Sequence, residues 1–303
     1  MNTDASIVLS LEKLGLTVKL NEDMSCHTTF KAGGRADYFI SAKTPESIYG
    51  AIKLAEKENI DYFILGKGSD TLFRDSGFNG FVISTAQYMT EIKVSGNIIK
   101  AQAGASLAHL CMTACENSLT GLEFAYGIPG SVGGAVFMNA GAYGGEMKDI
   151  IKSVTYLDKD GRIITKNRGS LDLSYRHSFF SDNPGCVIIS CEVELKKGVQ
   201  SEIKSKMDDL TERRRSKQPL EYPSAGSAFK RPEGYFASKL IDDCGLRGVS
   251  VGNAQISEKH TGFIVNKGGA TADDIIGLIK LVQKTVFEKT GVRLEPEIRI
   301  IPA

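Results

Sequence analysis

The sequence predicts an α+β protein with more than one domain. Three observations carry this prediction: a length of 303 residues, strand-like segments that alternate irregularly with helix-like ones, and a change of composition near residue 198. Single domains usually contain roughly 100–200 residues, so two or three domains sharing a cleft are expected. We place a first domain at 1–198, with lobes at about 1–85 and 86–198, and a second domain at 199–303.

The first 198 residues alternate between strands and helices. Residues 37–42 predict a strand, 47–60 a helix with one apolar face, and 62–70 a second strand, which together form a βαβ-like unit. A Gly-Asn dipeptide predicts the turn of a hairpin at 91–104, and an Asp-Gly dipeptide predicts the turn of a second hairpin at 153–166. The other expected elements are a strand at 81–85, a helix at 106–119 and a strand at 186–198.

The remaining chain opens with a charged amphipathic helix at 201–218, which ends before Pro219. A long helix at 271–291 is expected to begin at Thr271, because threonine caps helices and acidic residues in the first turn favour the positive end of the helix dipole. The other expected elements are a helix at 237–246 and strands at 255–257, 262–266 and 293–301.

Charge and hydropathy exclude several classes of protein. Lys and Arg number 37 against 36 Asp and Glu, so no net field is available to bind nucleic acid or an anionic membrane. Residues 1–20 lack a basic stretch followed by a long apolar run, so export is not expected. Residues 124–145 are uncharged, but a proline and seven glycines argue against a membrane helix.

The cysteines do not form a metal or disulfide pattern. There is no CxxC and no Cys/His pairing at zinc spacing. Cys111 and Cys115 lie four apart in a predicted helix near His109, which raises a metal site as an alternative, but buried reduced thiols are favoured because cysteine is common in protein cores. We therefore expect no metal, and a protein of the reducing cytoplasm.

Two glycine-rich segments suggest a bound ligand. We call residues 65–80 the first glycine segment and residues 127–146 the second; the second has seven glycines and no charge before Glu146. Glycine permits close backbone approach, and clustered N–H groups bind anions such as pyrophosphate. Neither segment matches the Rossmann or P-loop pattern. Tight turns are one interpretation; a large ligand that is part aromatic and part phosphate, such as a flavin dinucleotide, is the other.

Several motifs then carry a family resemblance over nearly the whole chain. The first glycine segment resembles the first FAD-binding loop of flavoproteins related to vanillyl-alcohol oxidase. The second resembles a loop of one family within that group, the UDP-N-acetylenolpyruvoylglucosamine reductases. The family's other motifs follow in order: HTTFKAGGRADYF (27–39), YRHSFF (175–180), SAGSAFKRP (224–232), HTGFIVN (260–266) and LEPEIRII (294–301). The compact length resembles the shorter of the family's two types.

The resemblance implies both a fold and a reaction. The fold is a two-lobed FAD-binding domain of the vanillyl-alcohol-oxidase/PCMH type plus a C-terminal α+β substrate-binding domain. The reaction takes hydride from NADPH to FAD and then to C3 of UDP-N-acetylglucosamine enolpyruvate, giving UDP-N-acetylmuramate for peptidoglycan. The resemblance also implies a cytoplasmic enzyme, which we expect to be monomeric.

Three residues match the family's catalytic positions. Arg176 matches the arginine that polarises the substrate carboxylate, a role suited to its forked guanidinium. Ser227 matches the proton donor to C2, which requires a dry site because a hydroxyl is a weak acid. Glu297 matches the residue that acts with Arg176 on the enolate, and Glu295 is expected on the same strand face. Without the motifs, Arg176 would be read as a surface ion pair and Ser227 as a turn residue.

Further residues match binding positions. Arg231 and Asp70 each stand where many relatives carry asparagine. Because a carboxylate would repel phosphate, we expect Asp70 to brace its loop rather than face the phosphate. The expected flavin contacts are Gly66, Gly68, Ser69, Asp70, Thr71, Gly127, Pro129, Gly130, Gly133, Gly134, Asn139, Gly141 and Ala142. The expected substrate contacts are Tyr175, Lys217, Lys230 and Arg231.

Two other functions remain open at this point. A related flavoprotein that oxidises an alcohol or hydroxy acid would consume oxygen rather than NADPH, although no histidine lies in an evident flavin-attachment motif. A non-catalytic sensor of nucleotide sugars would use the same fold with a redox-silent flavin. The presence of Arg176, Ser227 and Glu297 argues against the sensor, since binding alone requires no proton donor.

Overall fold

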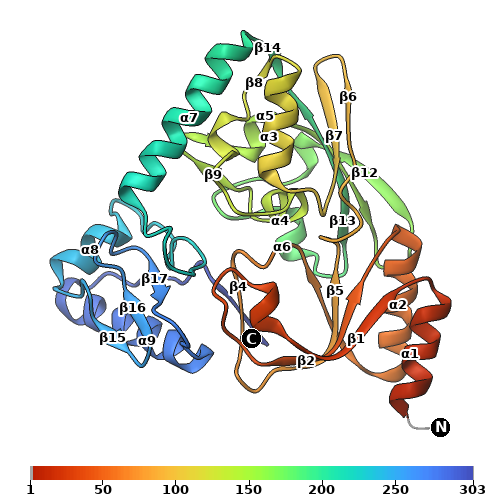
Figure 1. Ribbon diagram of the computed structural model, residues 1–303, viewed down its shortest axis with the longest axis horizontal. Helices are drawn as coiled ribbons and strands as arrows, with labels where there is room; N and C mark the ends of the chain where they lie inside the picture. The colour runs from red at the N-terminus through yellow and green to blue at the C-terminus, as the bar shows by residue number, and fades with distance from the viewer. Residues whose placement is uncertain (1–2, 303) are drawn as a thin grey trace. The chain divides into compact units, whose positions relative to one another are not determined.

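The computed structural model describes residues 3–302 and has a mixed α+β fold, as predicted (Figure 1). The helices are α1 (Thr3–Lys13), α2 (Pro45–Glu58), α3 (Leu107–Glu116), α4 (Val132–Phe137), α5 (Met147–Ile150), α6 (Phe179–Asp182), α7 (Gln200–Lys217), α8 (Ala237–Asp243) and α9 (Ala272–Thr290). Short 3₁₀ helices lie at η1 (Met24–His27), η2 (Glu123–Ala125) and η3 (Arg168–Ser170).

The strands range from two to eight residues. They are β1 (Thr17–Asp23), β2 (Arg35–Ser41), β3 (Asp61–Leu65), β4 (Thr71–Phe73), β5 (Phe78–Ser84), β6 (Ile92–Ser95), β7 (Ile98–Gln102), β8 (Leu119–Thr120), β9 (Gly141–Ala142), β10 (Gly145–Glu146), β11 (Ile151–Leu157), β12 (Ile163–Asn167), β13 (Val187–Glu194), β14 (Lys196–Lys197), β15 (Ser250–Val251), β16 (Ala254–Ile256), β17 (Ile264–Asn266) and β18 (Arg299–Ile301).

The chain divides into two compact units, each assembled from separated segments. The first unit comprises the chain through Leu20 together with Tyr38–Lys67 and Gly80–Arg213. The second comprises Asn21–Asp37, Gly68–Asn79 and the chain from Arg214 onward. The first glycine segment is therefore shared between the two units. The division predicted at residue 198 stays a prediction.

An N-terminal sheet belongs mainly to the first unit. Its strand order is β1-β2-β5-β3, and β3 runs parallel to β5. The βαβ-like unit expected over 37–70 is therefore present as β2, α2 and β3, with β5 inserted between the two strands. The strand predicted at 62–70 is shorter than expected, because β3 ends at Leu65 where the first glycine segment begins.

Helices α1 and α2 pack against each other and against this sheet (Figure 1). Helix α1 contributes Ile7 and Leu11, and helix α2 contributes Ile48 and Ile52, all buried with Phe81 of β5. The four-residue spacing within each helix places both side chains on one face, which is the pattern of an amphipathic helix. Helix α1 was not among the elements predicted from the sequence.

Local capping explains where the long helices begin and end. Helix α2 starts at a capping box formed by Thr44, with Pro45 in the first turn, and ends at Asn59 in the left-handed conformation (φ 54°). Helix α9 starts at a capping box formed by Thr271 and ends at Gly291 (φ 73°). The predicted start of α9 at Thr271 is confirmed.

The second sheet of the first unit is antiparallel, with strand order β12-β11-β13-β7-β6. Both predicted hairpins are present, and their turns contain Gly96 (φ 63°) and Gly161 (φ 82°), as the dipeptide signals required. Helix α3 buries Cys111 and Cys115 in the adjoining core, and burial raises the pKa of both thiols. The prediction of buried thiols is confirmed for this pair.

The second unit combines a small antiparallel sheet, β15-β16-β17, with the parallel pair β4 and β18. Helix α9 packs on β15 and β16, and α8 packs on α9. The core includes Ile279 and Val282 of α9, Ile256 and Ile264 of the sheet, and Leu72 of β4. No helix within residues 3–302 is both long enough and apolar enough to cross a membrane.

The strand predicted over 293–301 is wrong for most of its length. Regular pairing is confined to Arg299–Ile301, and the chain before it makes only an isolated bridge between Pro296 and Phe229. The two hydrogen bonds of this bridge flank the proline, from the N–H of Lys230 to the Glu295 carbonyl and from the N–H of Glu297 to the Ala228 carbonyl, and the pairing does not extend into a regular strand. The expected common strand face of Glu295 and Glu297 is therefore not part of a regular strand.

A buried asparagine joins distant parts of the second unit. The Nδ2 group of Asn266 donates to the carbonyl oxygens of Phe30 (2.9 Å) and Lys31 (3.3 Å). Its Oδ1 accepts from the backbone N–H groups of Gly268 (2.9 Å) and Ala270 (3.0 Å). The HTTFK and HTGFIVN motifs are thus held together by one amide side chain.

We expect the substitution Asn266→Ala to lower the free energy of unfolding by about 2–4 kcal/mol, because it leaves buried N–H and C=O groups without partners. The melting temperature should fall by about 5–10 °C. Circular dichroism melts of Asn266→Ala and of the exposed control Asn253→Ala check this expectation. Equal melting temperatures for the two variants would contradict it.

Candidate active site

The two glycine segments meet within the first unit. A Cβ atom added at Gly66 would lie 2.2 Å from Oγ of Ser131, so a side chain there would collide with Ser131 as it is placed. Ser131 is buried and caps α4 by accepting from the N–H of Gly134 at 3.3 Å. The N–H of Gly133 donates to the carbonyl of Ala103 at 2.8 Å. The glycines thus allow backbone approaches that larger residues would block.

The rest of the first glycine segment is braced within the second unit. Gly68 has a φ of +61°, and an added Cβ atom would lie 2.1 Å from the carbonyl oxygen of His27. The backbone N–H of Thr29 donates to Gly68 at 3.1 Å, and its hydroxyl donates to Ser69 at 3.4 Å. Thr71 follows as the buried first residue of β4. The HTTF motif therefore shapes this loop.

Asp70 lies beside β18 rather than standing alone. Its carbonyl oxygen accepts from the N–H of Arg299 at 3.0 Å, and its carboxylate attracts the Arg299 guanidinium. This arrangement supports the interpretation of Asp70 as a brace of the loop.

The second glycine segment forms a series of tight backbone contacts. Gly127 lies in a turn after η2, and Pro129 and Gly130 lead into α4. Gly141 and Ala142 form β9, which pairs with β10, and a Cβ atom at Gly141 would collide with the β10 backbone. The second segment thus provides a side-chain-poor backbone, uncharged before Glu146, of the kind that a flavin with its pyrophosphate requires.

Arg176 occupies a strained tight turn, which we call the Arg176 turn (residues 174–177). Ser174 and His177 exchange two backbone hydrogen bonds of 3.2 Å, with Tyr175 and Arg176 at the tip. Arg176 has a φ of +54°, which costs a non-glycine residue about 1–2 kcal/mol. Its guanidinium lies 4.9 Å from the centre of the Tyr175 ring. Such strain is concentrated at functional sites.

The end of α4 anchors the Arg176 turn on both sides. Nδ2 of Asn139 donates to the carbonyl of Ser174 at 2.9 Å. The hydroxyl of Ser178, which is fully buried, donates to the carbonyl of Phe137 at 2.7 Å. The second glycine segment, predicted to line the flavin, therefore also fixes the base of the predicted catalytic arginine.

A carboxylate lies within the electrostatic range of Arg176. Oε2 of Glu146 lies 2.7 Å from Nζ of Lys148 and accepts from Asn139 at 3.1 Å. The bond from Lys148 above all, with those from Asn139 and the charge of Arg176, holds the pKa of Glu146 below its ordinary value, although burial acts in the opposite direction. Glu146 is therefore an anion next to the turn.

His177 closes the turn from its outer side. Its Nδ1 lies 3.1 Å from the carbonyl oxygen of Asp172, and its Nε2 lies 3.0 Å from Oδ2 of Asp182. Both ring nitrogens donate in the protonated form, and the bond to the Asp172 carbonyl above all raises the pKa of His177; burial opposes this rise, and the Asp182 carboxylate adds to it. These three side chains could share a metal ion, yet the bonds described account for both ring nitrogens.

The raised pKa of His177 predicts a pH-dependent stability. The contribution should be complete below the ordinary histidine value of about 6.5 and disappear as the pH rises through the raised folded-state value. We expect the difference in melting temperature between the wild type and His177→Gln to be largest near pH 6 and to shrink toward pH 8.5. The exposed His109→Gln serves as control, and a difference that grows with pH would overturn the assignment.

Ser227 and Glu297 are brought together in the second unit. Ser227 is exposed, follows Gly226 (φ +76°) and forms a bridge with Phe263. The N–H of Glu297 donates to the carbonyl of Ala228 at 3.0 Å, so Glu297 pairs with the residue next to Ser227. The isolated bridges therefore replace the expected strand and still place these two predicted residues one position apart across the pairing.

The predicted substrate-binding cations also lie in the second unit. Lys230 donates its N–H to the Glu295 carbonyl at 2.9 Å, and the two side chains form an ion pair. The Arg231 guanidinium lies 4.0 Å from the centre of the exposed Phe236 ring. Lys217 is exposed at the last residue of α7. Lys230 and Arg231 follow the Ser227 segment directly, so three of the predicted functional residues share one short stretch of chain.

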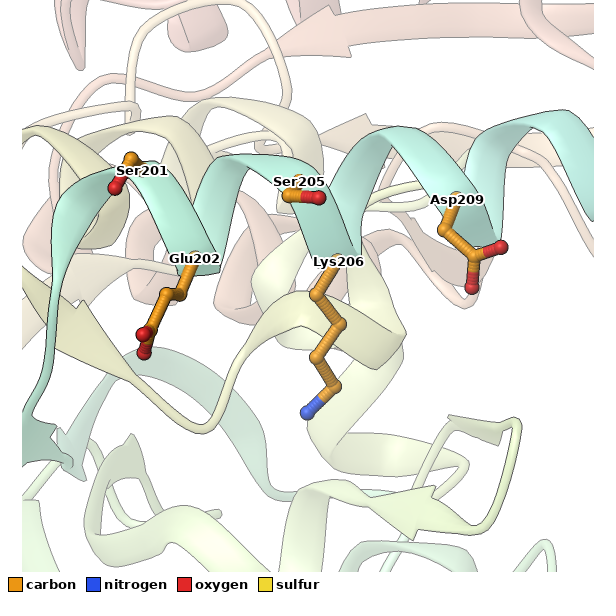
Figure 2. A pocket seen from close by; sticks show the side chains of 5 residues that line it. All are labelled: Ser201, Glu202, Ser205, Lys206 and Asp209. Atoms are coloured by element: carbon orange, nitrogen blue, oxygen red, sulfur yellow. The ribbon is translucent and has the colours of Figure 1, made fainter.

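An open pocket of about 500 Å³ lies along α7 and contains none of the predicted site residues (Figure 2). Lys206 projects from this helix, and its Nζ lies 3.4 Å from Oε2 of the buried Glu123. The lining residues are Ser201, Glu202, Ser205, Lys206 and Asp209, all from the same helix. This pocket is therefore not assigned to the candidate site.

Sequence patterns missed the residues that hold the site in place. Ser178, Glu146 and Asn266 bind backbone or side-chain groups of other segments, and Asn139 was assigned to the cofactor rather than to the protein. None of these bonds has a local sequence signature: three join residues at least 35 positions apart, and the bond between Asn139 and Glu146 spans seven. Asn139 and Ser178 nevertheless lie within the motifs that the sequence singled out.

Two protein-family models match this chain, one in its N-terminal part and one in its C-terminal part. The model of the UDP-N-acetylenolpyruvoylglucosamine reductase C-terminal domain matches residues 218–301. The model of an FAD-binding domain matches residues 36–167, a range that includes both glycine segments in full.

Individual proteins are similar over almost the full length. The UDP-N-acetylenolpyruvoylglucosamine reductase of Clostridium novyi is 51% identical over 284 residues, covering 94% of this chain and 92% of the relative. That of Clostridium botulinum strain Hall is 48% identical, covering 99% and 98%. The crystal structure of UDP-N-acetylenolpyruvylglucosamine reductase from Thermus caldophilus matches with a TM-score of 0.81 and 34% identity, covering 95% of this chain and 99% of that one.

Proposed function

Because the chain belongs to the UDP-N-acetylenolpyruvoylglucosamine reductase family, we propose that it uses NADPH to reduce UDP-N-acetylglucosamine enolpyruvate to UDP-N-acetylmuramate. It is a flavoprotein oxidoreductase of peptidoglycan precursor synthesis. The anchored Arg176 turn is the observation that supports the finer assignment most strongly, since a strained arginine whose turn is held by Asn139 of the second glycine segment is suited to act on a substrate carboxylate beside the flavin.

The glycine segments fit FAD. Gly66 and Gly68 approach other backbone or side-chain atoms too closely for any Cβ atom, and the second segment carries no charge before Glu146. We assign the pyrophosphate to the first segment (Gly66, Gly68, Ser69, Thr71) and the ring system to the second, with Asp70 as a brace. When bound, FAD supplies a hydride carrier between NADPH and C3 of the enolpyruvyl group.

Arg176 stabilises the negative charge that develops on the substrate during reduction. An enol ether is electron-rich, so the arrival of hydride at C3 pushes negative charge into the attached carboxylate. The guanidinium of Arg176 offers two parallel donors to that carboxylate and keeps its positive charge at any working pH. Donors fixed in advance in this way lower the barrier because they need no reorganisation during the reaction.

Ser227 and Glu297 complete the addition. Ser227 gives its hydroxyl proton to C2, so that hydride and proton together saturate the double bond, and the serine is reprotonated from solvent. Glu297, one position away across the pairing, acts on the enolate with Arg176. Tyr175, Lys217, Lys230 and Arg231 bind the substrate, with the cations on its diphosphate. The free cysteines support a reducing cytoplasm, and the monomeric state stays a prediction.

A visible spectrum of the purified protein under anaerobic conditions tests this proposal. NADPH should bleach the flavin band near 450 nm (roughly, for an oxidised flavin), and UDP-N-acetylglucosamine enolpyruvate should restore it. A flavin that bleaches but is reoxidised only by oxygen would refute the proposed substrate. A protein that holds no flavin after reconstitution would refute the assignment of the glycine segments.

A further inference from the structure

Asn139 is a buried amide in the second glycine segment. Its side chain has no exposed surface, and its backbone has a φ of +41°, which is uncommon for a residue other than glycine. Asparagine tolerates the left-handed conformation better than most residues. The position therefore selects a particular backbone conformation as well as an amide group.

The amide of Asn139 is fully engaged by the protein. Its Nδ2 donates to the Ser174 carbonyl at 2.9 Å and to Oε2 of Glu146 at 3.1 Å. Its Oδ1 accepts from the backbone N–H of Lys148 at 2.8 Å. An aspartate would have the same shape but only acceptor oxygens, facing a carbonyl and a carboxylate that both need a donor. These partners thus require an amide and reject a carboxylate.

We infer that Asn139 is a positioning residue that holds the Arg176 turn through the carbonyl of Ser174. That carbonyl also accepts the bond from His177 that closes the turn, so Asn139 fixes one of its two ends. The bond from Ser178 to Phe137 fixes the other end to the same helix. The expected effect of Asn139 on catalysis rests on the proposed function. Its expected effect on the conformation of the Arg176 turn does not.

Two variants of Asn139 test the inference against a matched control. Asn139→Asp keeps the shape and removes both donors, and Asn139→Ser removes them without adding charge, so that a folding failure of one variant leaves the other. The control is Asn117→Asp, which removes an amide-to-carbonyl bond of 2.8 Å to Thr113 at the end of α3. Asn117 is exposed and makes no described contact with the Arg176 turn.

The first measurement is limited trypsin digestion of the full-length, FAD-loaded protein. Trypsin cleaves after arginine, so the Arg176–His177 bond reports directly on opening of the turn. We expect cleavage at this bond to be about tenfold faster in the Asn139 variants than in the wild type, with Asn117→Asp within twofold of the wild type. An unchanged rate at this bond, or an equal acceleration at every site, would overturn the inference.

The second measurement separates the two half-reactions by stopped flow. The Asn139 variants should be reduced by NADPH within about threefold of the wild-type rate and reoxidised by the enolpyruvyl substrate at least about tenfold more slowly. Equal slowing of both steps, or loss of flavin, would assign Asn139 to the cofactor instead. If the wild type itself is not reoxidised by this substrate, the proposed function fails, and the tryptic result still decides the positioning role.

Discussion

Arg176→Lys should slow the reoxidation of the reduced flavoprotein by UDP-N-acetylglucosamine enolpyruvate about 100- to 1000-fold, the usual effect of removing one fixed donor at a developing charge. Lysine keeps the positive charge, but it cannot present two parallel donors to a carboxylate. The flavin should still be reduced by NADPH within about twofold of the wild-type rate, because that step does not involve the substrate carboxylate. Stopped-flow absorbance of each half-reaction measures both rates.

The control for this variant is Arg162→Lys, which alters an exposed arginine in the β11–β12 turn that pairs with Asp158 and Asp160. It should leave both half-reactions unchanged. If Arg176→Lys slowed flavin reduction as much as reoxidation, Arg176 would act on the flavin or on the fold rather than on the substrate. If Arg176→Lys changed neither rate, the proposed role of the arginine would be wrong.

Local signals predicted much of the fold. The capping box at Thr271, the hairpin turns at Gly96 and Gly161 and the apolar periodicity of α2 each depend on neighbouring residues, and all are confirmed. The family resemblance and the combination of an FAD-binding domain with a separate C-terminal domain are also confirmed. Physical information available within a few residues was sufficient for these elements.

The errors arose where distant contacts decide the outcome. Helix α1 buries Ile7 and Leu11, and these apolar residues become informative only when they pack with α2. The predicted strand over 293–301 is shorter in the structure because only Arg299–Ile301 pair regularly, with β4, a partner that no local pattern reveals. The second unit is also assembled from separated segments of the chain, in which Asn266 binds a carbonyl 236 positions earlier in the sequence.

In the candidate site, too, sequence motifs identified the candidate functional residues but not the hydrogen bonds that hold them in place. Its motifs singled out Arg176, Ser227 and Glu297, whose roles stay predictions, but they gave no sign of the bond of Asn139 to Ser174, 35 positions away. A motif indicates which chemistry is required, whereas the hydrogen bonds indicate how a strained residue such as Arg176 persists. The supporting residues therefore had to be found in the structure, and they are the ones on which the positioning argument depends.

Two alternatives from the sequence can now be weighed. A nucleotide-sugar sensor needs binding residues but no proton donor, so the presence of Arg176, Ser227 and Glu297 argues against it. An alcohol-oxidising flavoprotein would abstract a proton rather than deliver one. The reductase requires Ser227 to deliver a proton, whereas an alcohol-oxidising flavoprotein would require a group that removes one. Substitution of Ser227 therefore discriminates between these two functions.

Ser227→Ala should slow turnover about 100- to 10,000-fold, the range for loss of a positioned general acid. Flavin reduction by NADPH should stay near the wild-type rate, because the hydroxyl acts only after hydride has reached C3. Ser227→Cys should restore part of the activity, because a thiol is a stronger acid than a serine hydroxyl and of similar size. Steady-state NADPH consumption, together with stopped-flow reduction, measures these effects.

Ser224→Ala, three residues earlier in the same motif, is the matched control and should be nearly as active as the wild type. A wild-type reaction in D₂O should place deuterium at C2 of the product, because the serine proton exchanges with solvent. If Ser227→Ala were as active as Ser224→Ala, water or Glu297 would have to supply the proton. The exposed serine would then be a turn residue, as its position after the left-handed Gly226 would by itself suggest.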